Sequence, residues 1–239
     1  VLANAKHFPG HGDTALDSHL KLPVLNFDKA RLDSIELYPY KPIFDAGIAS
    51  VMTAHLSIPA LESNPNLPTS LSRPVVSTLL KEKLGFLGLV FTDGLNMKAV
   101  ANYSTSAEID LAAIHAGNDI LLIPQDVPAS FDLIKKSIAN KTLTKERIEE
   151  SVRKILLAKY KVGLHHYQPI DTSNLLQDLN DPNDEALHRK LVKASMTVLK
   201  NQKQILPIKD LKKNQKIAYL SLGDDSGEIF FIQPLFKKF

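Results

Sequence analysis

Short apolar segments alternate with helical patterns along the first two thirds of the chain. Runs of apolar residues, of the kind that form buried strands, occupy four stretches: residues 1–5, 48–55, 88–94 and 120–124. Helical spacing of apolar residues, or helix start and stop residues, marks five more: residues 28–46, 74–84, 107–116, 129–140 and 144–162. The repeated strand–helix alternation predicts an α/β fold with a parallel sheet.

Two prolines interrupt the first helical pattern. Residues 28–46 carry Pro39 and Pro42, and Gly47 follows directly. Because proline removes a backbone donor and clashes with the preceding turn, we expect a kinked or two-piece helix that ends at Gly47.

Reactive side chains lie at the ends of three of the four predicted strands. The first strand runs into Lys6 and His7, the second ends at His55 and the third at Asp93. In a (β/α)8 barrel, catalytic groups sit at the carboxyl ends of the strands, because the βα loops converge there. Four units make half of such a barrel, so two architectures remain: a doubly wound open sheet, or a barrel whose first half lies upstream of Val1.

Composition and charge narrow the function classes. The 239 residues are 44% hydrophobic and 23% charged, which is ordinary for a globular protein. The net charge of +3 comes from scattered lysines, a pattern that does not favour nucleic-acid binding. The sequence has no cysteine, which excludes disulfides, thiolate nucleophiles and cysteine-based zinc sites.

The chain shows no apolar run of about 18 residues and no signal peptide, so we expect no membrane span. It opens at Val1 inside an apparent strand, with no initiator methionine, and we expect the natural N-terminus to be missing. The compartment is therefore not fixed by the sequence, with a periplasmic or secreted location slightly favoured over a cytoplasmic one.

Histidines and acidic residues are concentrated directly after the first strand. A metal site is one hypothesis, and its ligands would come from this segment: His7, His11, His19, and Asp13 or Asp17. Two histidines four residues apart bind a metal best on a helix, and Pro9 and Gly10 prevent a helix here. The sequence therefore favours a reactive loop over a metal site.

Within this loop, Asp17 and His19 form a candidate acid–base dyad. In an extended loop, residues i and i+2 project to the same side, so Asp17 can hold one imidazole nitrogen while the other faces a substrate. The alternative is a turn in which Asp17 caps the next segment and His19 is merely polar. Lys6 and His7 are candidates for binding a hydroxyl-rich or anionic ligand.

Asp93 and His55 each have two interpretations. An unpaired carboxylate is costly to bury, so we expect Gly94 to turn the chain and leave Asp93 at a polar cleft. There Asp93 is either a nucleophile that forms a covalent intermediate or the cap of the following helix. His55 either contacts a substrate or hydrogen-bonds neighbouring loops.

Taken together, these motifs resemble a known family. Residues 6–13 and 17–19, followed by Leu22-Pro23, are similar to the signature loop of bacterial β-N-acetylglucosaminidases of glycoside hydrolase family 3. Residues 79–93 match the family pattern around its nucleophile. Weaker matches occur between and after these motifs, at residues 52–55, 116–119, 194–201 and 205–207.

The resemblance implies a TIM-like (β/α)8 barrel of which about the last four βα units are present. Residues 1–163 would form the second half of that barrel, 164–183 a linker, and 184–239 the truncated start of an α/β sandwich domain. The missing half-barrel normally supplies further sugar-binding groups, so we expect this polypeptide alone to be insoluble or inactive.

The resemblance also assigns roles. Asp93 would be the nucleophile of a retaining glycosidase, and His19, supported by Asp17, the general acid and base. Lys6 and His7 would hold sugar hydroxyls, with His55 a less certain contact, and no metal or cofactor would be needed.

The implied substrate is a glycan or muropeptide with terminal β-linked N-acetylglucosamine, such as a peptidoglycan fragment. Alternatives within the family are a β-glucosidase and an N-acetylglucosaminide phosphorylase. Alternatives from other classes are a metal-dependent barrel hydrolase and a non-catalytic cell-wall-binding relative.

Overall fold

The computed structural model describes residues 1–14, 16–18 and 20–204. The chain separates into two compact units, Val1–Pro169 and Ile170–Phe239. In the described part of the chain, no helix has both the length and the apolar character to cross a membrane.

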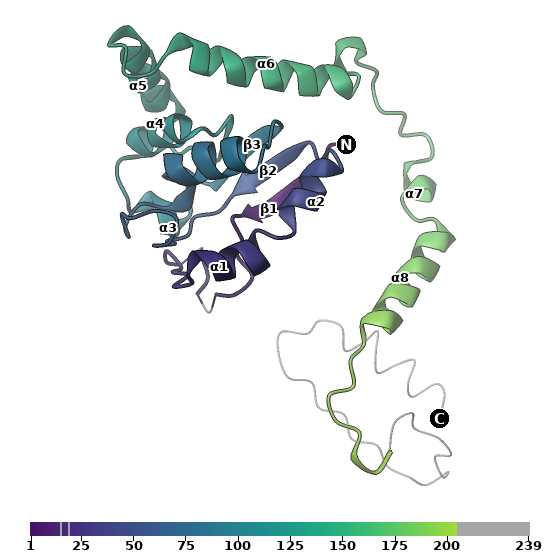
Figure 1. Cartoon of the computed structure of the whole chain (residues 1–239). Helices are drawn as coiled ribbons and strands as arrows, with labels where there is room; N and C mark the ends of the chain where they lie inside the picture. Colours follow the sequence, from purple (N-terminus) through teal and green to yellow (C-terminus); the bar gives the residue numbers. More distant parts are fainter. Residues whose placement is uncertain (15, 19, 205–239) are drawn as a thin grey trace. The chain divides into compact units, whose positions relative to one another are not determined.

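The first unit is built on a sheet of parallel strands (Figure 1). In the described residues it contains four strands, adjacent in chain order: β1 (Asn4–Phe8), β2 (Ser50–Thr53), β3 (Leu89–Gly94) and β4 (Ile120–Leu122). The predicted parallel α/β sheet is confirmed. Strand order runs without reversal, as in a barrel, whereas a doubly wound sheet reverses its order at a switch point.

The first strand begins and ends later than predicted. We expected a strand over residues 1–5 with Lys6 and His7 in the loop after it, but β1 includes both residues and reaches Phe8. Phe8 is fully buried and is in register with Thr53 of β2. The parallel ladder therefore holds Lys6 and His7 in the strand itself, although they are polar.

The helical segments of the first unit follow the predicted alternation. Their bounds are α1 (Lys29–Arg31), η1 (Leu32–Glu36), α2 (Tyr40–Asp45), η2 (Thr69–Leu71), η3 (Pro74–Lys83), α3 (Lys98–Ala101), α4 (Ser106–Ala116), α5 (Val127–Ala139), α6 (Lys145–Lys161) and η4 (Leu164–His166). The expected two-piece helix is confirmed, because the α1–η1 segment stops before Pro39 and α2 begins after it.

The second unit holds α7 (Leu175–Asp178), α8 (Pro182–Ser195) and η5 (Gln202–Gln204). Asp181 caps α8 by accepting a hydrogen bond from the backbone N–H of Asn183, and Pro182 occupies the first turn. Residues 205–239 of the expected sandwich domain, 184–239, lie outside the described residues, so that domain and its boundaries stay a prediction.

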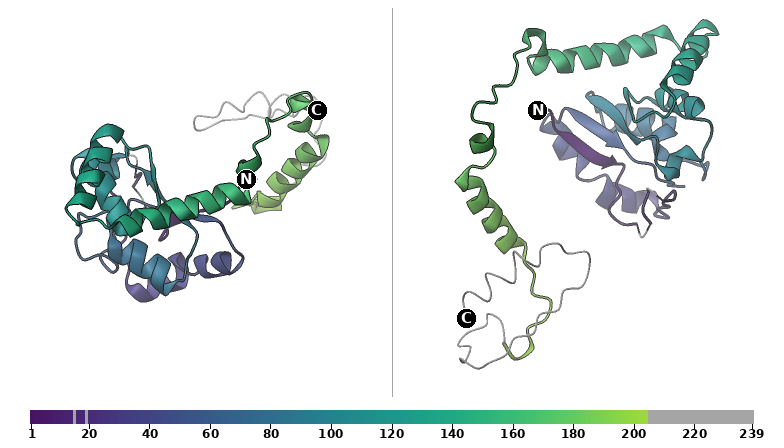
Figure 2. Two further views of the ribbon diagram at one scale, coloured as in Figure 1. Left: turned by 90° about the horizontal axis from the view of Figure 1, so that it is seen from above. Right: turned by 180° about the vertical axis from the view of Figure 1, so that it is seen from behind.

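Apolar side chains join the sheet to the helices that follow each strand. Phe8, Val51 and Val90 belong to one buried cluster with Val76 and Leu80 of η3. Because all the strand pairs are parallel, the carboxyl ends of the strands lie on the same side of the sheet. Figure 2 shows β1 at the margin of the sheet when the molecule is seen from behind.

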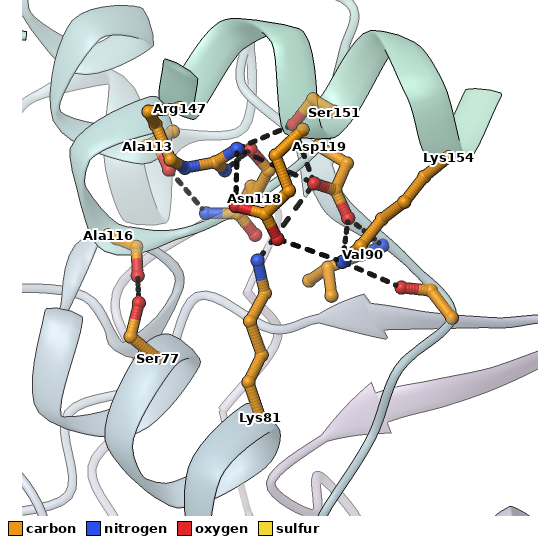
Figure 3. Close-up of polar contacts among 12 residues, drawn as sticks. Ser77, Lys81, Val90, Ala113, Ala116, Asn118, Asp119, Arg147, Ser151 and Lys154 are labelled. Atoms are coloured by element: carbon orange, nitrogen blue, oxygen red, sulfur yellow. Dashed lines mark hydrogen bonds and ion pairs between the residues drawn. The ribbon is translucent and has the colours of Figure 1, made fainter. Parts of the chain in front are cut away.

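A buried carboxylate, that of Asp119, lies at the amino end of the strands, directly before β4 (Figure 3). The side chain of Asp119 has no exposed surface. Its Oδ1 accepts a hydrogen bond from the hydroxyl of Ser151 at 2.6 Å, and its Oδ2 accepts one from the N–H of Val90 at 3.0 Å. Asp119 therefore ties α6 to the start of β3.

Three cationic side chains surround this carboxylate (Figure 3). Lys154 lies 3.3 Å from Oδ2, and Arg147 and Lys81 lie 3.6 and 3.9 Å from Oδ1. Burial lowers the pKa of Lys81 to about 8, and the attraction of Asp119 only partly offsets this. We call Asp119, Ser151 and these three cations the Asp119 cluster.

Candidate active site

The carboxyl ends of β1 and β3 bring His7 and Asp93 together, although β2 lies between the two strands. His7 Nε2 lies 3.5 Å from Asp93 Oδ2. This meeting across a strand follows from the sheet, because side chains from alternate strands point into the same layer of a barrel. The sequence prediction that these two residues share a site is consistent with this contact.

The Asp93 carboxylate is fixed at one oxygen and accessible from solvent. Its Oδ1 accepts a hydrogen bond from the N–H of Gly94 at 2.8 Å, and 18% of its side chain is exposed. Asp93 lies within β3, and the next described helix, α3, begins only at Lys98. Within the described residues Asp93 makes no helix-capping bond, since the N-cap of α3 is Met97, and a role of its carboxylate as nucleophile stays a prediction.

The side chain of His55 is almost completely buried. It follows β2 by two residues and is 1% exposed. Its Nε2 lies 3.0 Å from the carbonyl oxygen of Gly94, and its Nδ1 lies 2.6 Å from the hydroxyl of Ser70. Both ring nitrogens thus have protein partners, as in the second of the two interpretations, and a direct substrate contact stays a prediction.

The predicted acid–base dyad is only partly described. Asp17 is exposed, and its carbonyl accepts hydrogen bonds from the N–H groups of Leu20 and Lys21 at 3.0 and 3.1 Å. His19 lies outside the described residues. The Asp17–His19 pairing therefore stays a prediction.

Two ion pairs made by Arg31 hold the loop that carries this dyad. Arg31 donates to Asp13 Oδ2 at 3.0 Å and to Glu36 Oε1 at 2.9 Å, and its guanidinium stacks on the ring of Phe27. These ion pairs attach the beginning of the loop to the α1–η1 segment. Nothing in the sequence pattern singled out Arg31 or Glu36, because 18 residues separate Arg31 from Asp13.

An open groove of about 640 Å³ runs along β1 and extends under this loop. Lys6, His7, His11 and Asp13 are among its lining residues, but Asp93 is not. We therefore take this groove as a surface beside the site rather than as the substrate pocket itself.

The metal hypothesis gains no support from the described residues. Among them, no three histidine or acidic side chains are grouped in a way that would hold a metal ion. His7 and His11 approach each other edge to face, with ring centroids 6.0 Å apart, and His11 Nδ1 lies 3.5 Å from the hydroxyl of Thr14. These contacts are those of packed loop side chains.

Comparison with known proteins places this geometry in a family. Residues 1–158 match the glycosyl hydrolase family 3 N-terminal domain. The β-hexosaminidase A of Pseudoalteromonas piscicida is 28% identical over 94% of this chain, which spans 40% of that relative's length.

Two solved structures show similar folds. A family 3 β-N-acetylglucosaminidase from Paenibacillus is 36% identical, with a TM-score of 0.69, over 72% of this chain and 33% of the other. A β-glucoside phosphorylase is 25% identical, with a TM-score of 0.79, over 87% of this chain and 39% of the other. The sheet therefore forms part of a family 3 barrel domain, and the chain belongs to glycoside hydrolase family 3.

Proposed function

We propose that the protein containing this chain is a retaining glycosidase that releases terminal β-linked N-acetylglucosamine. The observation that carries the proposal is the Asp93 carboxylate at the carboxyl end of β3, held by Gly94 at one oxygen and facing His7 at the other. Membership of a glycoside hydrolase family supports it, as do relatives described as β-hexosaminidases.

In the proposed first step, Asp93 attacks the anomeric carbon and the bond to the leaving-group oxygen breaks, while His19 gives that oxygen a proton. The product is a glycosyl-enzyme ester on Asp93. In the second step His19 takes a proton from water, and the water oxygen displaces Asp93 from the anomeric carbon. Two inversions at this carbon retain its configuration.

An imidazole acid–base residue departs from the usual pair of carboxyl groups in retaining glycosidases. A neutral imidazole repels an anionic leaving group less than a carboxylate does, because it carries no negative charge. We therefore propose that the natural substrate is a peptidoglycan-derived fragment, in which the leaving muramic acid unit bears a carboxylate. Asp17 would orient His19 and support its protonated form.

We assign Lys6 and His7 to the sugar hydroxyls. Both lie near the carboxyl end of β1. The contact of His7 with Asp93 would place a hydroxyl-binding nitrogen beside the anomeric carbon. Such hydrogen bonds contribute most when they strengthen in the transition state.

Substrate choice tests the proposal directly. Turnover of an aryl β-N-acetylglucosaminide should exceed that of the matched aryl β-glucoside, and product analysis should show retained configuration. Preference for the glucoside would refute the assignment of the sugar, and an inverted product would refute the assignment of Asp93 as nucleophile.

Phosphorolysis is the second candidate, because a β-glucoside phosphorylase shares this fold with a TM-score of 0.79 over 87% of the chain. In that reaction phosphate replaces water in the second step, and a neutral His19 would admit the phosphate anion more readily than a carboxylate would. Addition of inorganic phosphate separates the two reactions: formation of sugar 1-phosphate indicates a phosphorylase, and an unchanged yield of free sugar indicates a hydrolase.

We propose further that activity requires the rest of the barrel, since the chain spans 40% of the length of the Pseudoalteromonas relative. Within the described residues, β1 and β4 each pair with one neighbouring strand, and α6 exposes Leu156, Leu157 and Tyr160. Unpaired strand edges and exposed apolar helix faces promote aggregation. Expression of residues 1–239 alone should give insoluble or inactive protein, and a soluble, monomeric, active preparation would contradict this.

A further inference from the structure

The ring of His55 is held in one tautomer beside Asp93. Its Nε2 lies 3.0 Å from the Gly94 carbonyl, which only accepts hydrogen bonds, so Nε2 carries a proton. In the neutral ring Nδ1 is then an acceptor, and the Ser70 hydroxyl donates to it at 2.6 Å. Burial lowers the pKa of His55, which stabilises this neutral form.

Gly94 connects this ring to the carboxylate. Its N–H donates to Asp93 Oδ1 at 2.8 Å, and its carbonyl accepts from His55. A Cβ atom on Gly94 would lie 2.8 Å from Oδ1 of Asn96, so a side chain at this position would require the Asn96 side chain to move. Glycine has wide backbone freedom, and these bonds, together with the hydrogen bond that the Gly94 carbonyl accepts from the Met97 N–H at 3.0 Å, fix its orientation.

Ser70 is itself fixed by a buried network. Its carbonyl accepts a hydrogen bond from Asn118 Nδ2 at 2.8 Å. Oδ1 of Asn118 lies 2.9 Å from the hydroxyl of Thr53, the last residue of β2. Ser70, Asn118 and Thr53 are all at most 1% exposed, so the network ties His55 rigidly to the start of β4 and the end of β2.

We propose that His55, oriented by Ser70, is a positioning residue that holds Gly94 so that Asp93 keeps the orientation needed for attack. The inference rests on the proposed role of Asp93 as nucleophile. His55 touches no substrate in this scheme, and it acts through the two backbone groups of Gly94. Loss of the His55–Gly94 bond lets the carboxylate leave its aligned position, which slows formation of the glycosyl-enzyme.

Steady-state kinetics with an aryl β-N-acetylglucosaminide, on the full-length protein that contains this chain, test the proposal. His55→Leu should lower kcat on the order of 100-fold, the scale of a small misplacement of reacting groups, and should change KM little. His55→Gln should restore most of kcat, because its amide nitrogen can still donate to the Gly94 carbonyl. Ser70→Ala should give a smaller loss, again in kcat.

Ser72→Ala is the matched control. Ser72 is as buried as Ser70, but its hydroxyl donates to Glu62 rather than to His55. The Ser72→Ala variant should leave kcat unchanged. Thermal unfolding identifies any variant that fails to fold, and if His55→Leu fails, the comparison of Ser70→Ala with Ser72→Ala decides.

Two outcomes would overturn the inference. A rise in KM with unchanged kcat in the His55 variants would show a direct substrate contact, and equal kcat in Ser70→Ala, Ser72→Ala and the parent would show no positioning role. The Asp93→Asn variant distinguishes failure of this inference about His55 from failure of the proposed function. If Asp93→Asn stays active, the proposed function itself is wrong.

Discussion

Two aspartates lie at opposite ends of neighbouring parallel strands, and they differ in how far their charge is neutralised. Asp119, directly before β4, has no exposed side-chain surface and is surrounded by three cations, a hydroxyl and a backbone N–H. Asp93, at the end of β3, is partly exposed, and within the described residues its carboxylate contacts the Gly94 N–H and His7. The carboxylate of Asp119 therefore stabilises the fold, whereas the carboxylate of Asp93 is accessible to solvent.

The difference follows strand direction. Residues at the amino ends of parallel strands of a barrel serve stability, whereas those at the carboxyl ends meet in the active site. Full neutralisation would weaken Asp93 in its proposed role as nucleophile, and incomplete neutralisation would make a buried Asp119 very costly. Each of the following variants tests one side of this comparison.

The largest expected effect is the loss of activity in Asp93→Asn. An amide cannot form the glycosyl ester, so kcat on the aryl β-N-acetylglucosaminide should fall by several orders of magnitude. The free energy of unfolding, from urea titration, should change by less than about 1 kcal/mol, because the carboxylate has few partners. Retained activity would remove Asp93 from the mechanism.

The reverse pattern is expected for Asp119→Asn. Removing this charge leaves Lys81, Arg147 and Lys154 without their buried partner, so the free energy of unfolding should fall by about 3–5 kcal/mol. Asp33→Asn, which breaks an exposed ion pair with Lys29, is the control and should cost less than about 1 kcal/mol. Equal losses in the two variants would show that the Asp119 cluster contributes no more than a surface ion pair.

His19→Ala should reduce activity unevenly. General acid catalysis contributes about 10²–10⁴-fold, and its loss affects poor leaving groups far more than activated ones. The rate on an unactivated disaccharide should therefore fall much further than the rate on an activated aryl glycoside. Equal losses on both substrates would indicate a positioning role for His19.

The smallest expected effect is a pH dependence of stability from Lys81. Its pKa is lowered to about 8 from 10.5, so the unfolded chain binds the proton more tightly than the folded one. The resulting destabilisation is complete below about pH 8 and disappears as pH rises to 10.5. Stability should therefore rise across this range relative to Lys81→Met, as measured by urea unfolding at several pH values, and a constant difference would contradict the shift.

The strand–helix order of the first unit was predictable from the sequence, because buried parallel strands form short apolar runs between helical patterns. The bounds of β1 were not. Lys6 and His7 look like loop residues in the sequence, yet the ladder to β2 keeps them in the strand. Local polarity could not reveal this, since the partner strand lies more than 40 residues further along the chain.

The residues of the candidate site were selected by their types and their places at strand ends, and their contacts could be predicted only in part. Asp93 stood out because it closes an apolar strand before a glycine. The burial of His55 was not predictable, because its partners Ser70 and Gly94 are 15 and 39 residues away. Asn118 and Asp119 are polar residues next to an apolar strand, as Asp93 is, but they precede β4, whereas Asp93 lies near the carboxyl end of β3.

The most direct test of the central claim is to identify the carboxylate that becomes glycosylated. The full-length protein is incubated with a fluorinated N-acetylglucosaminyl fluoride. This reagent glycosylates a retaining enzyme faster than the resulting glycosyl-enzyme hydrolyses. Peptides of the treated protein are then analysed by mass spectrometry. We predict one added sugar on the peptide that contains Asp93. A sugar on another residue, or turnover of the reagent with no covalent adduct at all, would contradict the account.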